Sequence, residues 1–510
     1  MHKRLTLFAA LLAALLVVSL PAGAAVPTDS AQLRAAVTAE NITMHLKAFQ
    51  SIADKNGGNR AAGTSGYQAS VDYVVKKLKQ AGYQPTRQTF EFPFFAETGP
   101  QEFERLTPTF RDYVRGTDFD IMQYSGAGDV TANVVATNDI VIPPGATAGT
   151  SNSGCEAADF PASTADNVAL IQRGTCTFEE KANNAKAAGA LAAIIFNEGQ
   201  EGRTDIINGT LGNPQTIPVL DTTFAVGEEL YTLTKSGSVS VHILTSTLSE
   251  TRTAENVIAE TAGGRADRVV VVGAHLDSVF AGPGMNDDGT GSAAILEVAR
   301  QMAKLGVQPA NKVRFAWWGA EELGLFGSAA YVSRLSARDI KNIALNLNFD
   351  MLGSPNYVRF VYDGDGGGDP EAAGPPGSAQ IEAIFNRYFA SQGLATEPTP
   401  FDGRSDYGPF IAVGIPAGGL FSGAEGVKTE EQADLFGGTA GVAYDECYHQ
   451  ACDDIDNVNT DAVNELGDAA AHAVATLAKT RSGWFPDGSL RVHHRATAEV
   501  RQARSIHPRR

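Results

Sequence analysis

The sequence predicts an α/β protein in which helices sandwich a mixed, mostly parallel sheet, with a second, β-rich region inserted. Over residues 253–478, apolar segments alternate with helical patterns, which is the rhythm of βαβ units. Residues 269–272 are four consecutive valines, as in strands buried on both faces. Between about residues 128 and 246, short strands and turns replace this rhythm. These observations define the fold class and divide the chain.

The main sheet and its helices can be placed in order along the chain. Apolar spacing predicts two helices between residues 38 and 82, and alternating phenylalanines predict a strand over residues 89–95. The later strands are expected at residues 269–272, 312–318 and 343–349, and the later helices at residues 292–305, 320–335, 378–392 and 461–479. In the inserted region we expect strands at residues 133–136, 168–171, 193–196 and 238–243, and a helix at residues 178–188.

The N-terminus has the pattern of a signal peptide. Residues 2–4 are charged, residues 5–20 are almost all apolar, and Ala22-Gly23-Ala24 supplies small residues for cleavage. A retained anchor is the less favoured alternative, because the apolar run is short for a membrane span. No later stretch of about 18 residues is both uncharged and long enough to cross a membrane. We expect a secreted, extracellular protein with no stable membrane anchor, periplasmic if the host has an outer membrane.

These patterns give five segments. They are a signal peptide at residues 1–24, an N-terminal part of the main domain at 25–127, the insert at 128–246, the rest of the main domain at 247–480 and a basic, flexible tail at 481–510. The formal net charge of -18 argues against a nucleic-acid partner, which would need a basic face. We favour a monomer.

The four cysteines fit an oxidising compartment. Three pairings are possible. We favour Cys155 with Cys176 and Cys447 with Cys452, because each pair closes within one segment. A zinc ribbon is the alternative, but it would require paired C-x2-C knuckles that the sequence lacks.

Five imidazole and carboxylate side chains, in an order that suits a two-metal site, are the candidate ligands: His275, Asp287, Glu322, Asp350 and His449. Several of them fall just past predicted strands, where ligands bind in open α/β sheets. Imidazole and carboxylate without thiolate suit zinc in a hydrolytic site, although manganese or cobalt could use the same ligands. The expected cofactor is two zinc ions per chain.

The ligands divide naturally into two sets. We assign His275 and Asp350 to one metal and Glu322 and His449 to the other, with Asp287 bridging from a glycine-bounded turn. Two zinc ions about 3.5–4 Å apart would clamp the reacting oxygens and activate a water molecule. Two catalytic roles are expected besides: Glu321 as general base, and Asp277 accepting the second N–H of His275.

Each motif alone has an ordinary explanation. Asp-Asp-Gly is usually a turn, and adjacent glutamates at a helix start usually favour the helix dipole. Of nine histidines, however, only His275 and His449 lie near acidic motifs. The joint pattern therefore favours a metal site.

At this point the chain resembles the secreted co-catalytic zinc aminopeptidases, which include bacterial leucyl aminopeptidases and aminopeptidase Y. The resemblance lies in residues 273–292, 318–322, 347–353, 401–406 and 447–449. It implies a zinc-exopeptidase-like fold and the same metal ligands. It also implies three substrate-binding residues, each of which ordinary packing could explain instead: Tyr448 at the oxyanion, Arg404 in the binding segment and Phe421 in an apolar pocket. Residues 169–178 make the insert similar to a protease-associated domain.

The expected activity is removal of N-terminal residues, with a preference for apolar, leucine-like ones, from peptides or proteins. A carboxypeptidase or dipeptidase would need arginines for the substrate carboxylate, and Arg404 alone is weak support. A glutaminyl-cyclase-like enzyme would need one zinc ion only. A non-catalytic, receptor-like relative would have lost a ligand or Glu321.

Overall fold

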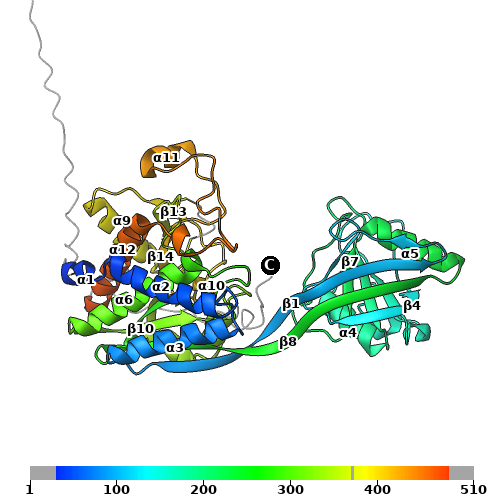
Figure 1. Ribbon diagram of the computed structural model, residues 1–510, viewed down its shortest axis with the longest axis horizontal. Helices are drawn as coiled ribbons and strands as arrows, with labels where there is room; N and C mark the ends of the chain where they lie inside the picture. The colour runs from blue at the N-terminus through cyan, green and yellow to red at the C-terminus, as the bar shows by residue number, and fades with distance from the viewer. Residues whose placement is uncertain (1–29, 369–372, 482–510) are drawn as a thin grey trace, which may run out of the picture.

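The computed structural model describes residues 30–368 and 373–481. The predicted signal peptide and the tail beyond Arg481 therefore lie outside the described residues. Two lobes are connected by a pair of long antiparallel strands, β1 (Thr86–Thr107) and β8 (Ser240–Glu260), which run from one lobe into the other (Figure 1). From the sequence we expected only short strands at the two places.

The larger lobe is built on a mixed sheet. Its order is β13-β12-β14-β11-β9-β10-β8, with β1 paired to β8. Strands β14, β11, β9 and β10 are mutually parallel, whereas β12 and β8 run antiparallel to their neighbours β14 and β10. The predicted mixed, mostly parallel sheet is thus confirmed. The bounds are β9 (Arg265–His275), β10 (Asn311–Trp318), β11 (Ile343–Phe349), β12 (Phe360–Tyr362), β13 (Glu397–Thr399) and β14 (Ala417–Phe421).

Helices cover both faces of this sheet. One face carries a group formed of α1 (Ala31–Ala36), α2 (Ala39–Lys55), α3 (Ser65–Gln80), α6 (Gly291–Lys304), α9 (Ser378–Ser391) and α12 (Thr460–Lys479). The opposite face carries α7 (Phe326–Ser333), α8 (Ala337–Asn342) and α10 (Tyr407–Ala412). A further helix, α11 (Glu430–Phe436), projects from the top of this lobe in Figure 1.

The valine run explains the central position of β9. Val270 and Val272 pack into the core on one face of the sheet, whereas Val269 and Val271 pack into the core on the other. Because successive side chains of a strand point to opposite faces, only a run of apolar residues can satisfy both cores.

The helix predicted at residues 320–335 was wrong in its first part. Its helical portion, α7, begins only at Phe326. Ala320 and Leu325 have φ values of 55° and 61°, in the left-handed region that a continuous helix cannot use. Residues 320–325 instead form a turn directly after β10, which frees the side chains of Glu321 and Glu322 from a helix surface.

The smaller lobe continues the sheet through β8 in the order β8-β4-β5-β6-β7-β3. Its elements are β2 (Arg111–Asp112), β3 (Phe119–Ile121), β4 (Gly128–Ala136), β5 (Val168–Gln172), α4 (Phe178–Ala187), β6 (Ala192–Phe196), β7 (Val219–Thr222) and α5 (Phe224–Ser236).

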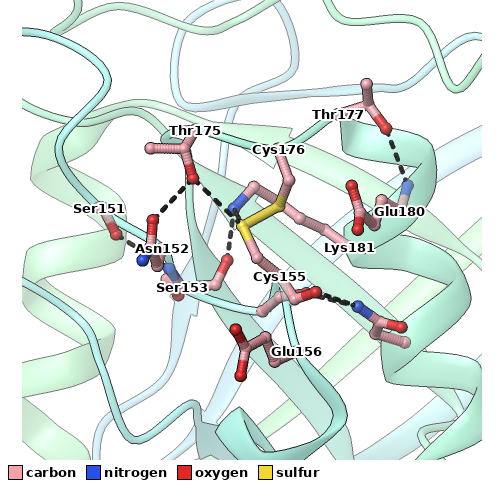
Figure 2. Close-up of a disulfide and its surroundings, with 12 residues drawn as sticks. Ser151, Asn152, Ser153, Cys155, Glu156, Thr175, Cys176, Thr177, Glu180 and Lys181 are labelled. Carbon is pink, nitrogen blue, oxygen red and sulfur yellow. Dashed lines mark hydrogen bonds between the residues drawn. A yellow bond between two sulfur atoms is a disulfide. The ribbon is translucent and has the colours of Figure 1, made fainter.

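Both favoured disulfides are present, Cys155–Cys176 in the smaller lobe and Cys447–Cys452 in the larger. Figure 2 shows the first, with the side chain of Lys181 beside it. The Lys181 ammonium donates to the carbonyl of Ser153 and lies 3.7 Å from Cys155 Sγ. Burial lowers the pKa of Lys181 to about 8. Within the residues that the structure describes, no helix is both long and apolar enough to cross a membrane.

Candidate metal centre

The five predicted ligands meet at one edge of the larger sheet. His275 ends β9, Glu322 lies in the turn after β10, and Asp350 directly follows β11. Asp287 lies in the irregular turn Met285–Thr290 before α6, and His449 lies in the loop between α11 and α12. The carboxyl ends of the parallel strands β9, β10 and β11 share this edge, which brings the residues together.

The distances between ligand atoms divide the cluster into two halves. His275 Nε2 lies 3.0 Å from Asp287 Oδ1 and 3.4 Å from Asp350 Oδ1. His449 Nε2 lies 3.2 Å from Asp287 Oδ2 and 2.9 Å from Glu322 Oε2. Tetrahedral zinc with bonds of about 2.0–2.1 Å places neighbouring ligand atoms about 3.3 Å apart. Each carboxylate oxygen of Asp287 thus faces a different imidazole, and each of the two oxygen–nitrogen distances suits a shared zinc ion.

Two buried oxygen atoms support the same interpretation. Oε1 of Glu321 and Oε1 of Glu322 have no hydrogen-bond partner among residues 30–368 and 373–481. A buried carboxylate oxygen without a partner is costly, and such groups commonly pair with a cation or coordinate a metal. The ligand types and the open oxygens therefore fit divalent cations.

Asp288 also lies near His275 and Asp350, with ligand atoms close enough to hold an ion. Its carboxylate, however, already accepts backbone N–H groups from His275 at 3.1 Å, Gly291 at 2.9 Å and Met351 at 3.0 Å. These bonds fix the backbone on which the ligands His275 and Asp350 stand. We therefore regard Asp288 as a support of the site rather than a ligand.

The contact between Asp277 and His275 differs in detail from the expectation. His275 Nδ1 lies 3.1 Å from the backbone carbonyl oxygen of Asp277 but 3.7 Å from its carboxylate. The carboxylate instead accepts the backbone N–H groups of Glu321 at 3.2 Å and Glu322 at 3.4 Å. Asp277 thus holds the turn that carries both glutamates, and its carbonyl, rather than its carboxylate, contacts the imidazole.

The protonation of the cluster reflects its crowded negative charge. Burial alone would lower the pKa of His275, but Asp350 and Glu321 outweigh it and raise that pKa. Burial alone would also lower the pKa of His449, but Asp287 and Glu322 outweigh it and raise that pKa to about 10. Burial and the charge of Asp287 raise the pKa of Glu322 to about 7. Protons thus balance the carboxylates, and binding of a divalent cation would displace them.

The predicted substrate-binding residues line a cavity of about 280 Å³ that opens on the ligands. Phe421 stacks on Phe360 at 5.9 Å and forms part of an apolar wall. Arg404 donates to Glu425 at 2.7 Å and to the hydroxyl of Tyr448 at 3.1 Å. The rim of the cavity is therefore polar, whereas one wall is aromatic.

Sequence reasoning missed several residues that support the ligands. The fully buried Arg60 donates from Nε to the carbonyl of Pro283 at 2.8 Å and also bonds the carbonyls of Leu276 and Gly284. Ser405 donates its hydroxyl to Asp350 Oδ2 at 2.5 Å. Arg60 stands 216 residues before Leu276 in the sequence, so no local pattern could have linked them.

An α/β sheet with a carboxylate–imidazole cluster at its carboxyl edge defines a metal-dependent hydrolase. Residues 256–474 match peptidase family M28, and residues 130–230 match the PA domain. An aminopeptidase of Pseudomonas aeruginosa is 49% identical over 442 residues, covering 86% of this chain and 81% of that protein. Leucine aminopeptidase 2 of Trichophyton tonsurans is 40% identical over 450 residues, covering 88% and 85%.

Solved structures give the same result. An aminopeptidase from Aneurinibacillus sp. strain AM-1 is similar with a TM-score of 0.62 and 26% identity, covering 89% of this chain and 97% of that one. A zinc aminopeptidase from Bacillus subtilis is similar with a TM-score of 0.56 and 25% identity, covering 87% and 96%. The chain belongs to peptidase family M28, carries a PA domain and is a metallo-aminopeptidase.

Proposed function

We propose that the protein is an exported enzyme that uses two zinc ions to remove apolar residues from the N-termini of peptides. The observation that carries this proposal is the bridging geometry of Asp287, whose two oxygens lie 3.0 Å and 3.2 Å from the imidazoles of His275 and His449. One carboxylate between two imidazoles suits a pair of ions better than one ion.

The residues would divide the work as follows. His275 and Asp350 would hold one ion, Glu322 and His449 would hold the other, and Asp287 would be shared between them. When bound, the ions polarise the scissile carbonyl and lower the pKa of a water molecule toward neutrality. Glu321 would accept a proton from the attacking water molecule and return it to the leaving amine, and its Oε1, which has no hydrogen-bond partner among the described residues, leaves room for this role. The hydroxyl of Tyr448 donates to the developing oxyanion.

The free amine of the substrate explains why the enzyme would cut only at N-termini. An ammonium group is best held by carboxylates, and Glu321 and Asp350 both line the cavity. A blocked terminus would lose this charge-assisted contact. The apolar wall formed by Met351, Phe360 and Phe421 suits a leucine-like side chain. The names of the leucine aminopeptidase relatives agree with this preference.

Arg404 gives little support to a carboxypeptidase. Its guanidinium already pairs with Glu425 at 2.7 Å. A substrate carboxylate would have to compete with that ion pair, so we propose no second activity. Export is supported by the N-terminal sequence pattern and by the two disulfides, which persist in oxidising compartments.

A chromogenic anilide assay tests the proposal directly. We expect the protein to release p-nitroaniline from leucine p-nitroanilide and to fail with the same substrate when its amine is acetylated. A panel of amino-acid anilides should favour leucine, methionine and phenylalanine over aspartate and lysine. Cleavage of the acetylated compound at a comparable rate would remove the aminopeptidase interpretation of this site.

A further inference from the structure

We propose that Asp453 is a positioning residue of the metal centre, which fixes the loop that carries His449 against the turn that carries Asp287. The inference rests on the ligand assignment proposed above. Asp453 directly follows the Cys447–Cys452 disulfide, and only 2% of its surface is exposed. Asp453 is neither one of the proposed metal ligands nor one of the proposed catalytic groups.

Three consecutive backbone N–H groups of the Asp287 turn donate to Asp453. The N–H of Asn286 donates to Oδ1 at 2.8 Å and that of Asp287 donates to Oδ2 at 3.0 Å. The N–H of Met285 donates to the backbone carbonyl of Asp453 at 2.9 Å. Both carboxylate oxygens and the carbonyl are thereby engaged by one short segment. Because both carboxylate oxygens accept neighbouring N–H groups of the turn, the turn can bind Asp453 in only one orientation.

The loop that carries His449 depends on such a contact. The His449 side chain is 34% exposed, so close packing does not hold it in place. The disulfide closes the loop between Cys447 and Cys452, but it connects the loop only to itself. At the near end of the loop, Asp445 accepts the N–H of Cys447 at 2.8 Å and the side-chain amide of Asn286 at 2.6 Å. Both ends of the loop therefore hold the same turn.

Asn457 connects the two supporting carboxylates. Its side-chain amide lies 3.1 Å from Asp453 Oδ1 and 3.1 Å from each oxygen of Asp445. The Asn457 amide thus stabilises the pair of carboxylates that would otherwise repel each other. These hydrogen bonds connect the Asp287 turn to both ends of the His449 loop. They therefore help to set the distance between Asp287 Oδ2 and His449 Nε2, which is 3.2 Å.

The consequence concerns the ion between Glu322 and His449. Changing Asp453 to asparagine keeps the shape of the side chain but replaces one acceptor oxygen with an NH2 group. That group would face a backbone N–H donor, so one amide of the turn would lose its partner. The turn and the loop should then move apart. Groups that orient metal ligands contribute about 10- to 100-fold to metal affinity.

The test is a zinc titration of the full chain carrying Asp453→Asn. Zinc-loaded protein is dialysed against buffers of graded free zinc, and the bound metal is measured by elemental analysis. We expect wild-type protein to keep two ions where the variant keeps one, with the weaker site shifted by about 10- to 100-fold. Cobalt titration followed by visible absorption gives a second, independent readout of metal binding at the same site.

Asp454→Asn is the matched control. It removes the same charge from the neighbouring residue, whose side chain accepts the N–H of Asp456 at 2.9 Å and makes no hydrogen bond to the Asp287 turn among the described residues. Retention of two tight ions by Asp453→Asn, or equal weakening in Asp454→Asn, would overturn the proposal. If Asp453→Asn does not fold, Asn457→Ala decides, because it should weaken the same site to a smaller degree, and unchanged affinity would overturn the proposal. Wild-type protein with fewer than two ions would contradict the metal centre itself.

Discussion

Glu321 combines two properties that a general base needs in this site. It is only 4% exposed, and burial raises the pKa of its carboxyl group well above the ordinary value. Its Oε2 lies 4.0 Å from His275 Nε2, close enough to reach a water molecule that bound ions would hold between the ligand sets. A carboxylate with a raised pKa can both accept a proton from water and release it to an amine.

The role of Glu321 leads to a prediction about turnover. Changing Glu321 to glutamine should lower kcat by about 10²- to 10⁴-fold, because the amide cannot accept the proton. Bound metal, measured by elemental analysis, should stay unchanged, since Glu321 is not assigned as a ligand. Glu446→Gln, in an exposed position of the His449 loop, serves as control and should keep wild-type activity. A Glu321→Gln enzyme with wild-type kcat would refute the role.

At the scale of single residues, the sequence could indicate only the candidate metal ligands and the candidate general base. The five proposed ligands and Glu321 stand beside recognisable strand ends and turns. Arg60 and Asp453 could not be found in this way, because their partners are backbone groups distant in the chain. Asp453, for example, lies 166 residues after Asp287. A single sequence carries no signal for such contacts.

At the scale of elements, the packing of α12 against α1 and α9 contains a buried histidine. Nδ1 of His472 in α12 lies 2.8 Å from Ser30 Oγ, and its ring stacks on Tyr388 of α9 at 4.7 Å. Burial, assisted by the positive charge of Arg34, lowers the pKa of His472 from 6.5 to about 4. Arg34 also lies 3.7 Å from Asp468, the other charged group of this contact.

This histidine should make the fold less stable in mild acid. Between about pH 6.5 and pH 4 the unfolded chain binds a proton at His472 that the folded chain does not, so stability falls as the pH falls. Between pH 7 and pH 5 we expect a loss of about 1 kcal/mol after allowance for partial exposure. In thermal unfolding, wild-type Tm should therefore fall by about 1–2 °C more than that of His472→Gln. Parallel decreases in the two proteins would show that His472 does not titrate as described.

The elements themselves were predictable where apolar periodicity was strong. Strand β11 occupies the predicted residues 343–349, and α6, α9 and α12 begin within one residue of the prediction. The turn at residues 320–325 was not predictable, because Ala320 and Leu325 favour helices yet adopt left-handed backbone conformations. Tertiary contacts outweigh the local preference there, including the two hydrogen bonds that the Asp277 carboxylate accepts from the turn.

At the scale of the whole molecule, β1 and β8 connect the PA-domain lobe to the lobe that carries the metal centre (Figure 1). Phe94 of β1 packs edge-on against Phe280 at 5.3 Å, and Phe280 lies in the loop that follows Asp277. Arg252 of β8 lies 3.4 Å above the Phe94 ring. The connecting strands thus contact the loop that begins at the metal centre, a relation that the short predicted strands did not reveal.

The central claim is that the fold brings five distant side chains around two divalent ions, and anomalous X-ray scattering from crystals of the zinc-loaded protein tests it most directly. Data collected above and below the zinc absorption edge should show two peaks about 3.5–4 Å apart on either side of Asp287. One peak should lie beside His275 and Asp350, and the other beside Glu322 and His449. A single peak, or none within bonding distance of Asp287, would contradict the account.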